Sequence, residues 1–249
     1  MSLSFQKRTL SVVLSPEEPL PEVDLWLVLD LLRATTTMVT FFSLGGERLY
    51  PVATPEQARE LRKTLGEKVL LMGERNSLPP EGFDLGNSPR DLSEGLCQSR
   101  PEAVMTTTNG TRAVLKAAAS GKPVLAASIR NASAVIRGCA PFSRTGILCA
   151  GRYGKAALDD TLGAGYLADL FRRTFPGAVL EDGASIALWS WQRQAPELEK
   201  AVRLSEHAAI LEGQGFEKDI SFCCTPDQTR EIPRLGNKKG HLCFERNPS

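Results

Sequence analysis

The stretch AVMTTTNGTRAVLKAAASG, residues 103–121, passes from a short apolar run into an alanine-rich pattern that ends at Gly121. The apolar residues suit a buried strand, and the later residues suit a helix closed by a glycine C-cap. Hydroxyl side chains, Asn109 and Gly110 lie between the two, and such residues favour turns and caps over helix interiors. The stretch therefore predicts a strand, a polar turn and a helix in that order.

The polar turn in this stretch has two interpretations. One hydroxyl or amide is enough to cap a helix, whereas this junction offers several. A surplus of donors at a helix N-terminus also suits an anion-binding site. Capping and anion binding both remain open from this stretch alone. The residues concerned are Thr107, Thr108, Asn109, Gly110 and Thr111.

The same alternation of strand and helix patterns continues along the chain, which predicts an α/β fold with a mainly parallel sheet. Strands are expected at residues 11–14, 25–30, 48–53, 68–74, 103–107, 123–128 and 146–151. Helices are expected within residues 34–46, 54–66, 109–121, 131–140, 158–175, 183–194 and 196–215. We expect one domain over residues 1–249, with a short strand near the end and an irregular tail from about residue 236.

Composition excludes several classes of protein. The 249 residues are 42% hydrophobic and 24% charged, as in globular proteins with a sizeable core. The net charge of +1 predicts no general attraction to nucleic acid or to a membrane. The sequence has neither a long apolar run nor a signal-peptide pattern at its start, so we expect a cytoplasmic protein. Its six cysteines form no CxxC pair and are expected to be buried, reduced thiols.

Polar and charged residues follow five of the expected strands. Ligands of parallel sheets bind outside the carboxyl ends of the strands, so these residues are expected along one edge. Each has a simpler explanation as a turn residue, a cap or a solvated charge. Besides the polar turn after residue 105, the sets are Asp30 and Arg33; Glu74 and Arg75; Ser128, Arg130 and Asn131; and Gly151, Arg152, Asp159 and Asp160.

Residues 73–92 form a long polar insertion with three prolines and no helix or strand period. Structureless segments of this length in compact domains are often functional. The alternative is a mobile surface loop.

Carboxylates beside arginines and few histidines favour a hard cation such as Mg²⁺ over zinc. Asp30, Glu74 and Asp160 are the candidate ligands and catalytic carboxylates, and the combination predicts metal-assisted phosphoryl transfer. Leu32 stands where aspartyl-phosphate enzymes carry a second aspartate, and no phosphate-binding GxxxxGK[ST] loop is present. His207, inside a helical pattern, is interpreted as structural.

The segments LDLLRATTT, GERNSLPPEGFDLGNSP, TTTNGT, ASIRNASAV and CAGRYGKAALDDTLGAG resemble the 2-phosphosulfolactate phosphatase family in order and spacing. The resemblance covers about residues 25–235. It implies a three-layer α/β/α fold with a mainly parallel or mixed sheet, a Mg²⁺ cofactor and a homodimer. It also implies hydrolysis of 2-phospho-3-sulfolactate to 3-sulfolactate and phosphate, a step toward coenzyme M.

The resemblance also implies roles for individual residues. Asp30 and Arg33, Glu74 and Arg75, and Asn87 and Ser88 match three motifs of the family, and residues 107–111 match its hydroxyl-rich turn. The family has Glu-Asp where this chain has Asp159–Asp160. The side chain at position 159 is therefore one methylene shorter, which favours Asp160 as the metal ligand. Cys149 also matches, but a small thiol at a strand end favours packing over catalysis. The implied anion ligands are Arg33, Arg75, Asn87, Ser88, Thr107, Thr108, Asn109, Gly110, Thr111, Ser128 and Asn131.

The implied substrate carries three anionic groups, so several arginines are expected around it: Arg33, Arg75, Arg90, Arg130 and Arg152. Two alternatives stay open. One is a phosphatase of another small phosphorylated carboxylic acid, because a fold does not fix its substrate. The other is a binder of anionic metabolites without catalysis. Covalent phospho-enzyme chemistry and direct attack by water are likewise both open.

Overall fold

The computed structural model describes residues 7–246, which form one ten-stranded mixed sheet with helices on both faces. The strands are β1 (Thr9–Val13), β2 (Leu25–Leu29), β3 (Arg48–Pro51), β4 (Leu70–Gly73), β5 (Glu102–Thr106), β6 (Val124–Ala127), β7 (Arg144–Cys149), β8 (Val179–Leu180), β9 (Arg234–Lys238) and β10 (His241–Glu245). The helices are α1 (Ala34–Ser43), α2 (Pro55–Leu65), α3 (Glu94–Ser99), α4 (Gly110–Ala118), α5 (Ala132–Gly138), α6 (Leu158–Thr174), α7 (Asp182–Gln194), α8 (Leu198–Val202), α9 (Glu206–Gly213) and α10 (Glu217–Cys224).

The sheet has the order β4-β5-β3-β10-β9-β6-β2-β7-β1-β8. It contains two sets of strands, and the strands within each set are parallel. Strands β6, β2, β7, β1 and β8 run parallel to one another, as do β4, β5 and β3. The hairpin β9–β10 joins the sets by antiparallel pairing with β6 and β3. The three-layer α/β/α fold with a mixed sheet is confirmed.

The expectation of an irregular tail from about residue 236 is wrong, because residues 234–245 form this hairpin inside the sheet. Its turn residues Lys239 and Gly240 both have positive φ, as a tight two-residue hairpin turn requires. Most side chains of β9 are exposed, so the segment lacks the apolar alternation that reveals a strand.

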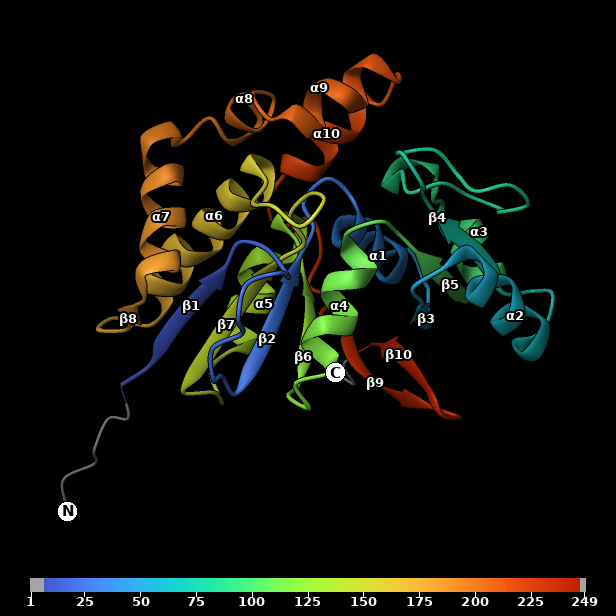
Figure 1. Ribbon diagram of the computed structural model, residues 1–249, viewed down its shortest axis with the longest axis horizontal. Helices are drawn as coiled ribbons and strands as arrows, with labels where there is room; N and C mark the ends of the chain where they lie inside the picture. Colours follow the sequence, from blue (N-terminus) through green and yellow to red (C-terminus); the bar gives the residue numbers. More distant parts are fainter. Residues whose placement is uncertain (1–6, 247–249) are drawn as a thin grey trace.

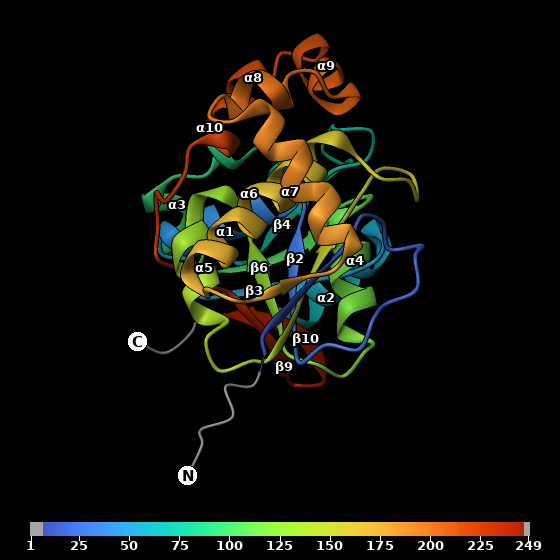
Figure 2. The same ribbon diagram turned by 90° about the vertical axis from the view of Figure 1, so that its left-hand side faces the viewer.

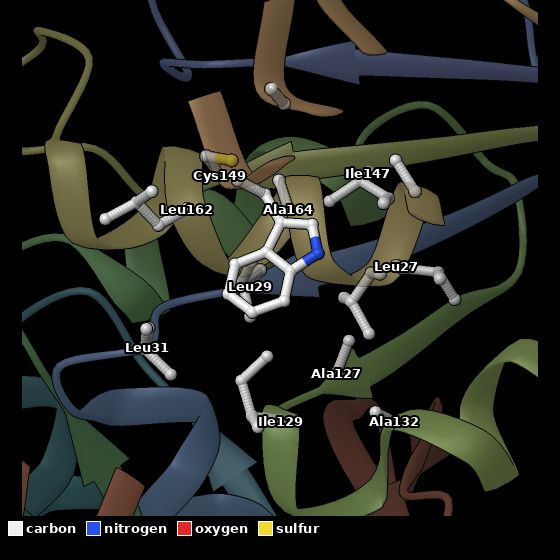
Figure 3. Packing of buried hydrophobic residues seen from close by; sticks show 14 of the residues in the cluster. Leu27, Leu29, Leu31, Ala127, Ile129, Ala132, Ile147, Cys149, Leu162 and Ala164 are labelled. Atoms are coloured by element: carbon white, nitrogen blue, oxygen red, sulfur yellow. The ribbon is translucent and has the colours of Figure 1, made fainter. Parts of the chain in front are cut away.

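Strand β2 is buried on both faces, and its side chains divide between two cores. Leu27 and Leu29 pack with β6, β7 and α6, as Figure 3 shows, whereas Trp26 and Val28 face the opposite side. This period of two is the geometry of an extended chain. Each fully buried leucine stabilises the fold by about 1.5–3 kcal/mol relative to an exposed one.

Helices α1 and α4 pack against both parallel sets. The core that contains Met38 of α1 and Val114 of α4 also contains Val28 of β2 and Met105 of β5. All of residues 34–42 are buried, so α1 has no solvent face. Because one core joins the two sets, the carboxyl ends of β2 and β5 come together although an antiparallel hairpin separates them in the sheet.

Helices α8, α9 and α10 lie together at one end of the molecule, opposite the β9–β10 hairpin (Figures 1 and 2). The helix expected over residues 196–215 is divided into α8 and α9, and Ser205 caps α9 by accepting a hydrogen bond from the Ala208 N–H. All six cysteines are free and buried, as predicted. Within residues 7–246, no helix is both long and apolar enough to cross a membrane.

Candidate active site

Asp30 follows β2 and lies at the start of α1. Its Oδ1 accepts a hydrogen bond from the Ala34 N–H at 3.2 Å, and its backbone N–H donates to Thr35. A Cβ atom at Gly110 would lie 2.6 Å from Asp30 Oδ2 and 2.3 Å from the Ala34 side chain. Glycine at position 110 therefore allows α4 to begin directly beside Asp30. Burial raises the pKa of Asp30 to about 6, although His207 and the Ala34 N–H act in the opposite direction.

Glu74 follows β4 and connects its loop to the turn after β5. One carboxylate oxygen accepts a 2.7 Å hydrogen bond from the Thr108 N–H, and the other accepts a bond from the Ser77 N–H at 3.0 Å. Both oxygens are thus engaged by the backbone. Glu74 fixes Thr108 and the insertion next to Asp30, as expected from their positions at strand ends.

The threonine-rich turn divides into a structural and an exposed part. Thr107 Oγ1 accepts a hydrogen bond from the Thr111 N–H, and Thr111 Oγ1 accepts one from the Thr107 N–H. These two buried side chains stabilise the turn itself. Thr108 and Asn109 instead line a cavity with Asp30. Capping and site formation are therefore performed by different residues of the same turn.

Asp159 and Asp160, at the start of α6, differ in their partners. Asp160 accepts hydrogen bonds from the Leu31 N–H at 2.8 Å and the Gly151 N–H at 2.9 Å, so it ties the ends of β2 and β7 together. Burial raises the pKa of Asp160 well above its usual range, and the nearby carboxylates Asp159 and Asp30 add to this. Asp159 is equally buried, but its Oδ1 has no hydrogen-bond partner in the described chain.

This difference predicts that substitutions at the two neighbouring aspartates change the free energy of unfolding differently. Asp160→Ala leaves two buried N–H groups unpaired, and we expect it to lower the free energy of unfolding by about 2–4 kcal/mol. Asp159→Ala breaks no backbone hydrogen bond and removes a buried charge, so stability should be kept or raised. Urea unfolding of both variants measures the difference. Equal losses of stability would contradict the structural role of Asp160.

The sequence pattern favours a structural role for His207, but its side chain lines the cavity together with Asp30. Its Nδ1 lies 3.4 Å from Asp159 Oδ2. Helix α9 therefore brings an imidazole to the edge of the sheet although His207 is 177 positions away from Asp30 in the chain. Only the fold reveals this, because a lone histidine in an amphipathic helix gives no sequence signal.

The arginines expected to bind anions are mostly engaged elsewhere. Arg33 is buried, pairs with Asp219 at 2.7 Å, donates to the Ser77 carbonyl and lies over the Phe216 ring. Ser88 donates to the same aspartate. This network attaches α10 and the insertion to the start of α1.

Arg33 nevertheless lines the cavity with Asp30, whereas three other arginines do not. Arg75 donates to the backbone oxygens of Glu74 and Ala53 and to Thr106, and Arg130 donates to the Phe222 carbonyl. Arg90 is exposed. Arg152 does line the cavity, and among residues 7–246 its charged partner is the exposed Glu206 at 3.5 Å.

Ser128 and Asn131 are also brought together away from the cavity. The Asn131 amide oxygen accepts a hydrogen bond from the Ser128 N–H, and its amide group donates to the Ala126 and Glu231 carbonyls. Both side chains are fully buried and serve as a capping box. Cys149 is buried as well, and burial raises the pKa of its thiol well above the usual range, which favours packing over nucleophilic chemistry.

The long insertion contributes directly to the site. Asp84 holds it in place by accepting hydrogen bonds from Arg62, Arg100 and the Leu71 N–H. Its residues Asn76, Ser77 and Asn87 line the cavity with Asp30. The functional interpretation of the insertion therefore has structural support.

The donors around the cavity suit a hard cation. Asn87 Oδ1, at the cavity, and Asp159 Oδ1, beside it, are buried without a hydrogen-bond partner in the described chain. Only one carboxylate oxygen of Asp30 accepts a hydrogen bond there. Mg²⁺ binds such oxygens, with water completing its coordination. Across residues 7–246, no three His, Cys, Asp or Glu side chains are grouped as a metal site. Glu74 and Asp160 already use their oxygens on backbone N–H groups, which separates them from this donor set.

Comparison with known proteins gives consistent matches over nearly the whole chain. A family model described as 2-phosphosulpholactate phosphatase matches residues 11–238. The chain is 40% identical over 241 residues to the probable 2-phosphosulfolactate phosphatase of Thermus thermophilus, which covers 95% of this chain and 99% of the relative. It is 38% identical over 226 residues to the Thermotoga maritima protein of the same description, with 91% and 95% covered. The Clostridium acetobutylicum relative is 31% identical over 211 residues, with 84% and 88% covered.

Proposed function

Because this chain belongs to the 2-phosphosulfolactate phosphatase family, we propose that it is a Mg²⁺-dependent phosphatase that hydrolyses 2-phospho-3-sulfolactate to 3-sulfolactate and phosphate. The observation that carries the proposal is the meeting of Asp30, Glu74, Thr108 and His207 at one cavity. These residues come from the ends of β2, β4 and β5 and from α9.

The charge of the site supports a cation. Asp30, Glu74, Asp159 and Asp160 lie near one another, whereas Arg152 is the arginine there without a buried carboxylate partner. A site of this charge repels an anionic ester unless a metal ion neutralises it. Asp30 and Asn87 have free oxygens that would hold Mg²⁺, with Asp159 as a further donor. When bound, the ion would polarise the phosphoryl group and stabilise charge on its oxygens.

The protein groups have distinct roles in this proposal. The Thr108 and Asn109 side chains face the phosphoryl oxygens, and the fixed turn beneath them limits their motion. His207, beside Asp159, is placed to deliver a proton to the alkoxide that leaves phosphorus. Asp30 is the negatively charged group that the reaction needs, as ligand or as nucleophile.

The substrate assignment predicts a preference for the sulfonate. Removing the sulfonate forfeits one charge-assisted contact, so phosphosulfolactate should exceed phospholactate in kcat/KM by roughly ten- to a hundredfold. Both values are measured at the same Mg²⁺ concentration and ionic strength, because salt screens such contacts. Equal values would refute the sulfonate assignment and leave the phosphatase chemistry in place.

Engagement of Arg33, Arg75 and Arg130 within the fold favours the second candidate, a phosphatase of another small phosphorylated acid. A turnover screen over phosphomonoesters with and without Mg²⁺ separates the two candidates. A non-catalytic binder is disfavoured, because burying carboxylates beside an anionic ligand weakens binding without a compensating gain.

A further inference from the structure

The cavity at Asp30 is too small for an organic phosphate ester. Its volume is about 30 Å³, which is room for about one or two water molecules. A second cavity of about 430 Å³ adjoins it, and Arg152, Tyr153 and His207 line both. The outer cavity must therefore receive most of any substrate whose phosphoryl group reaches Asp30.

The outer cavity combines apolar side chains with charged groups of both signs. Tyr153, Leu158 and Leu204 line it with exposed fractions of 62%, 44% and 71%, and they are three of the six large hydrophobic side chains most exposed in the described chain. Arg152 and Lys155 supply positive charge at the same cavity, and Asp159 and Glu206 supply negative charge. Exposed apolar side chains gathered beside a polar site are typical of ligand-binding surfaces.

We infer that the outer cavity is a subsite for the organic part of the substrate, and that besides the three-carbon skeleton of sulfolactate it also admits a phosphorylated hydroxy acid with a larger apolar group. The volume lies within the range of about 300–1,000 Å³ seen for drug-sized ligands. The apolar group packs on Leu204 and Tyr153, and the carboxylate lies near Arg152 and Lys155. This inference rests on the proposed phosphatase activity and extends its substrates to larger hydroxy acids.

Two esters test the inference, because they share the same type of leaving oxygen and differ only in a phenyl group. O-phospholactate is the small ester, and O-phospho-3-phenyllactate is the large one. We expect kcat/KM for the large ester to be about tenfold higher in the wild-type protein with Mg²⁺. Leu204→Ala should remove most of that preference while leaving turnover of the small ester unchanged.

Ile186→Ala is the matched control, because Ile186 is also an exposed aliphatic side chain but lies on α7 outside this cavity. It should keep the tenfold ratio. Glu206→Gln should lower KM for the large ester, because Glu206 no longer competes with the substrate for Arg152. A preference for the small ester, or a ratio unchanged by Leu204→Ala, overturns the inference.

Product binding separates failure of the subsite from failure of the proposed activity. Titration calorimetry with 3-phenyllactate and with lactate needs no turnover. Tighter binding of phenyllactate that Leu204→Ala weakens supports the subsite even if neither ester is hydrolysed, and in that case only the phosphatase assignment fails. Equal binding of the two acids overturns the subsite.

Discussion

Asp30→Asn should lower kcat by at least about a hundredfold while the protein stays folded. Asparagine can still accept the hydrogen bond from the Ala34 N–H, which Asp30 Oδ1 accepts at 3.2 Å. It cannot supply the negative charge that a metal ligand or a nucleophile provides. Because the pKa of Asp30 is raised only to about 6, the native carboxyl is mostly ionised above neutral pH. The substitution therefore removes a negative charge that the native protein carries.

Thermal unfolding distinguishes loss of chemistry from loss of fold. Asp30 is buried near Asp159 and Glu74, whose charges disfavour its ionised form. Removing its charge should therefore leave Tm unchanged or slightly raised. Asp182→Asn, at an exposed aspartate in the first turn of α7, serves as the matched control and should keep both kcat and Tm. Near-normal kcat in purified Asp30→Asn would show that Asp30 is only a turn residue.

The sequence predicts the strand ends of the site well, because each depends on local pattern. Asp30 and Glu74 directly follow apolar runs, and the turn at residues 107–111 lies between a strand pattern and a helix pattern. All three meet at the cavity. The sequence analysis explains this meeting by a parallel sheet whose strands all end at one edge, and that explanation is incomplete. The strands belong to two parallel sets, and packing of both against α1 and α4 brings their ends together.

Side-chain partners far apart in the chain could not be predicted in this way. Arg33 resembles an anion ligand by position, but Asp219 is 186 residues away and neutralises it. His207 reaches the site because α9 lies above the sheet edge, and no periodicity of its own helix indicates that. The length of the side chain favours Asp160 over Asp159 as the metal ligand in the sequence analysis. In the fold, however, the carboxylate of Asp160 accepts hydrogen bonds from the Leu31 and Gly151 N–H groups. In each case tertiary contacts decide which charge is free.

Removing divalent cations should have the largest effect, reducing hydrolysis to the background rate. The buried carboxylates near Asp30 oppose the approach of an anionic ester, and the free oxygens of Asp30, Asn87 and Asp159 suit Mg²⁺. Activity is measured after EDTA treatment and again after Mg²⁺ is added back. EDTA already saturated with Mg²⁺ is the control for effects of the chelator itself. Full turnover by the metal-free protein would contradict this prediction.

Binding of Mg²⁺ can be followed without catalysis, because an ion that binds only the native state stabilises it by about 2.7 kcal/mol at a hundred times its Kd. We expect Mg²⁺ to raise Tm of the wild-type protein and not of Asp30→Asn. The pKa of Asp30 near 6 sets the pH dependence. Below that pH the carboxyl is neutral and protons compete with the metal, so the rise in Tm should shrink as pH falls from about 7.5 to 5. A rise that is independent of pH, or that persists in Asp30→Asn, would place the ion away from Asp30.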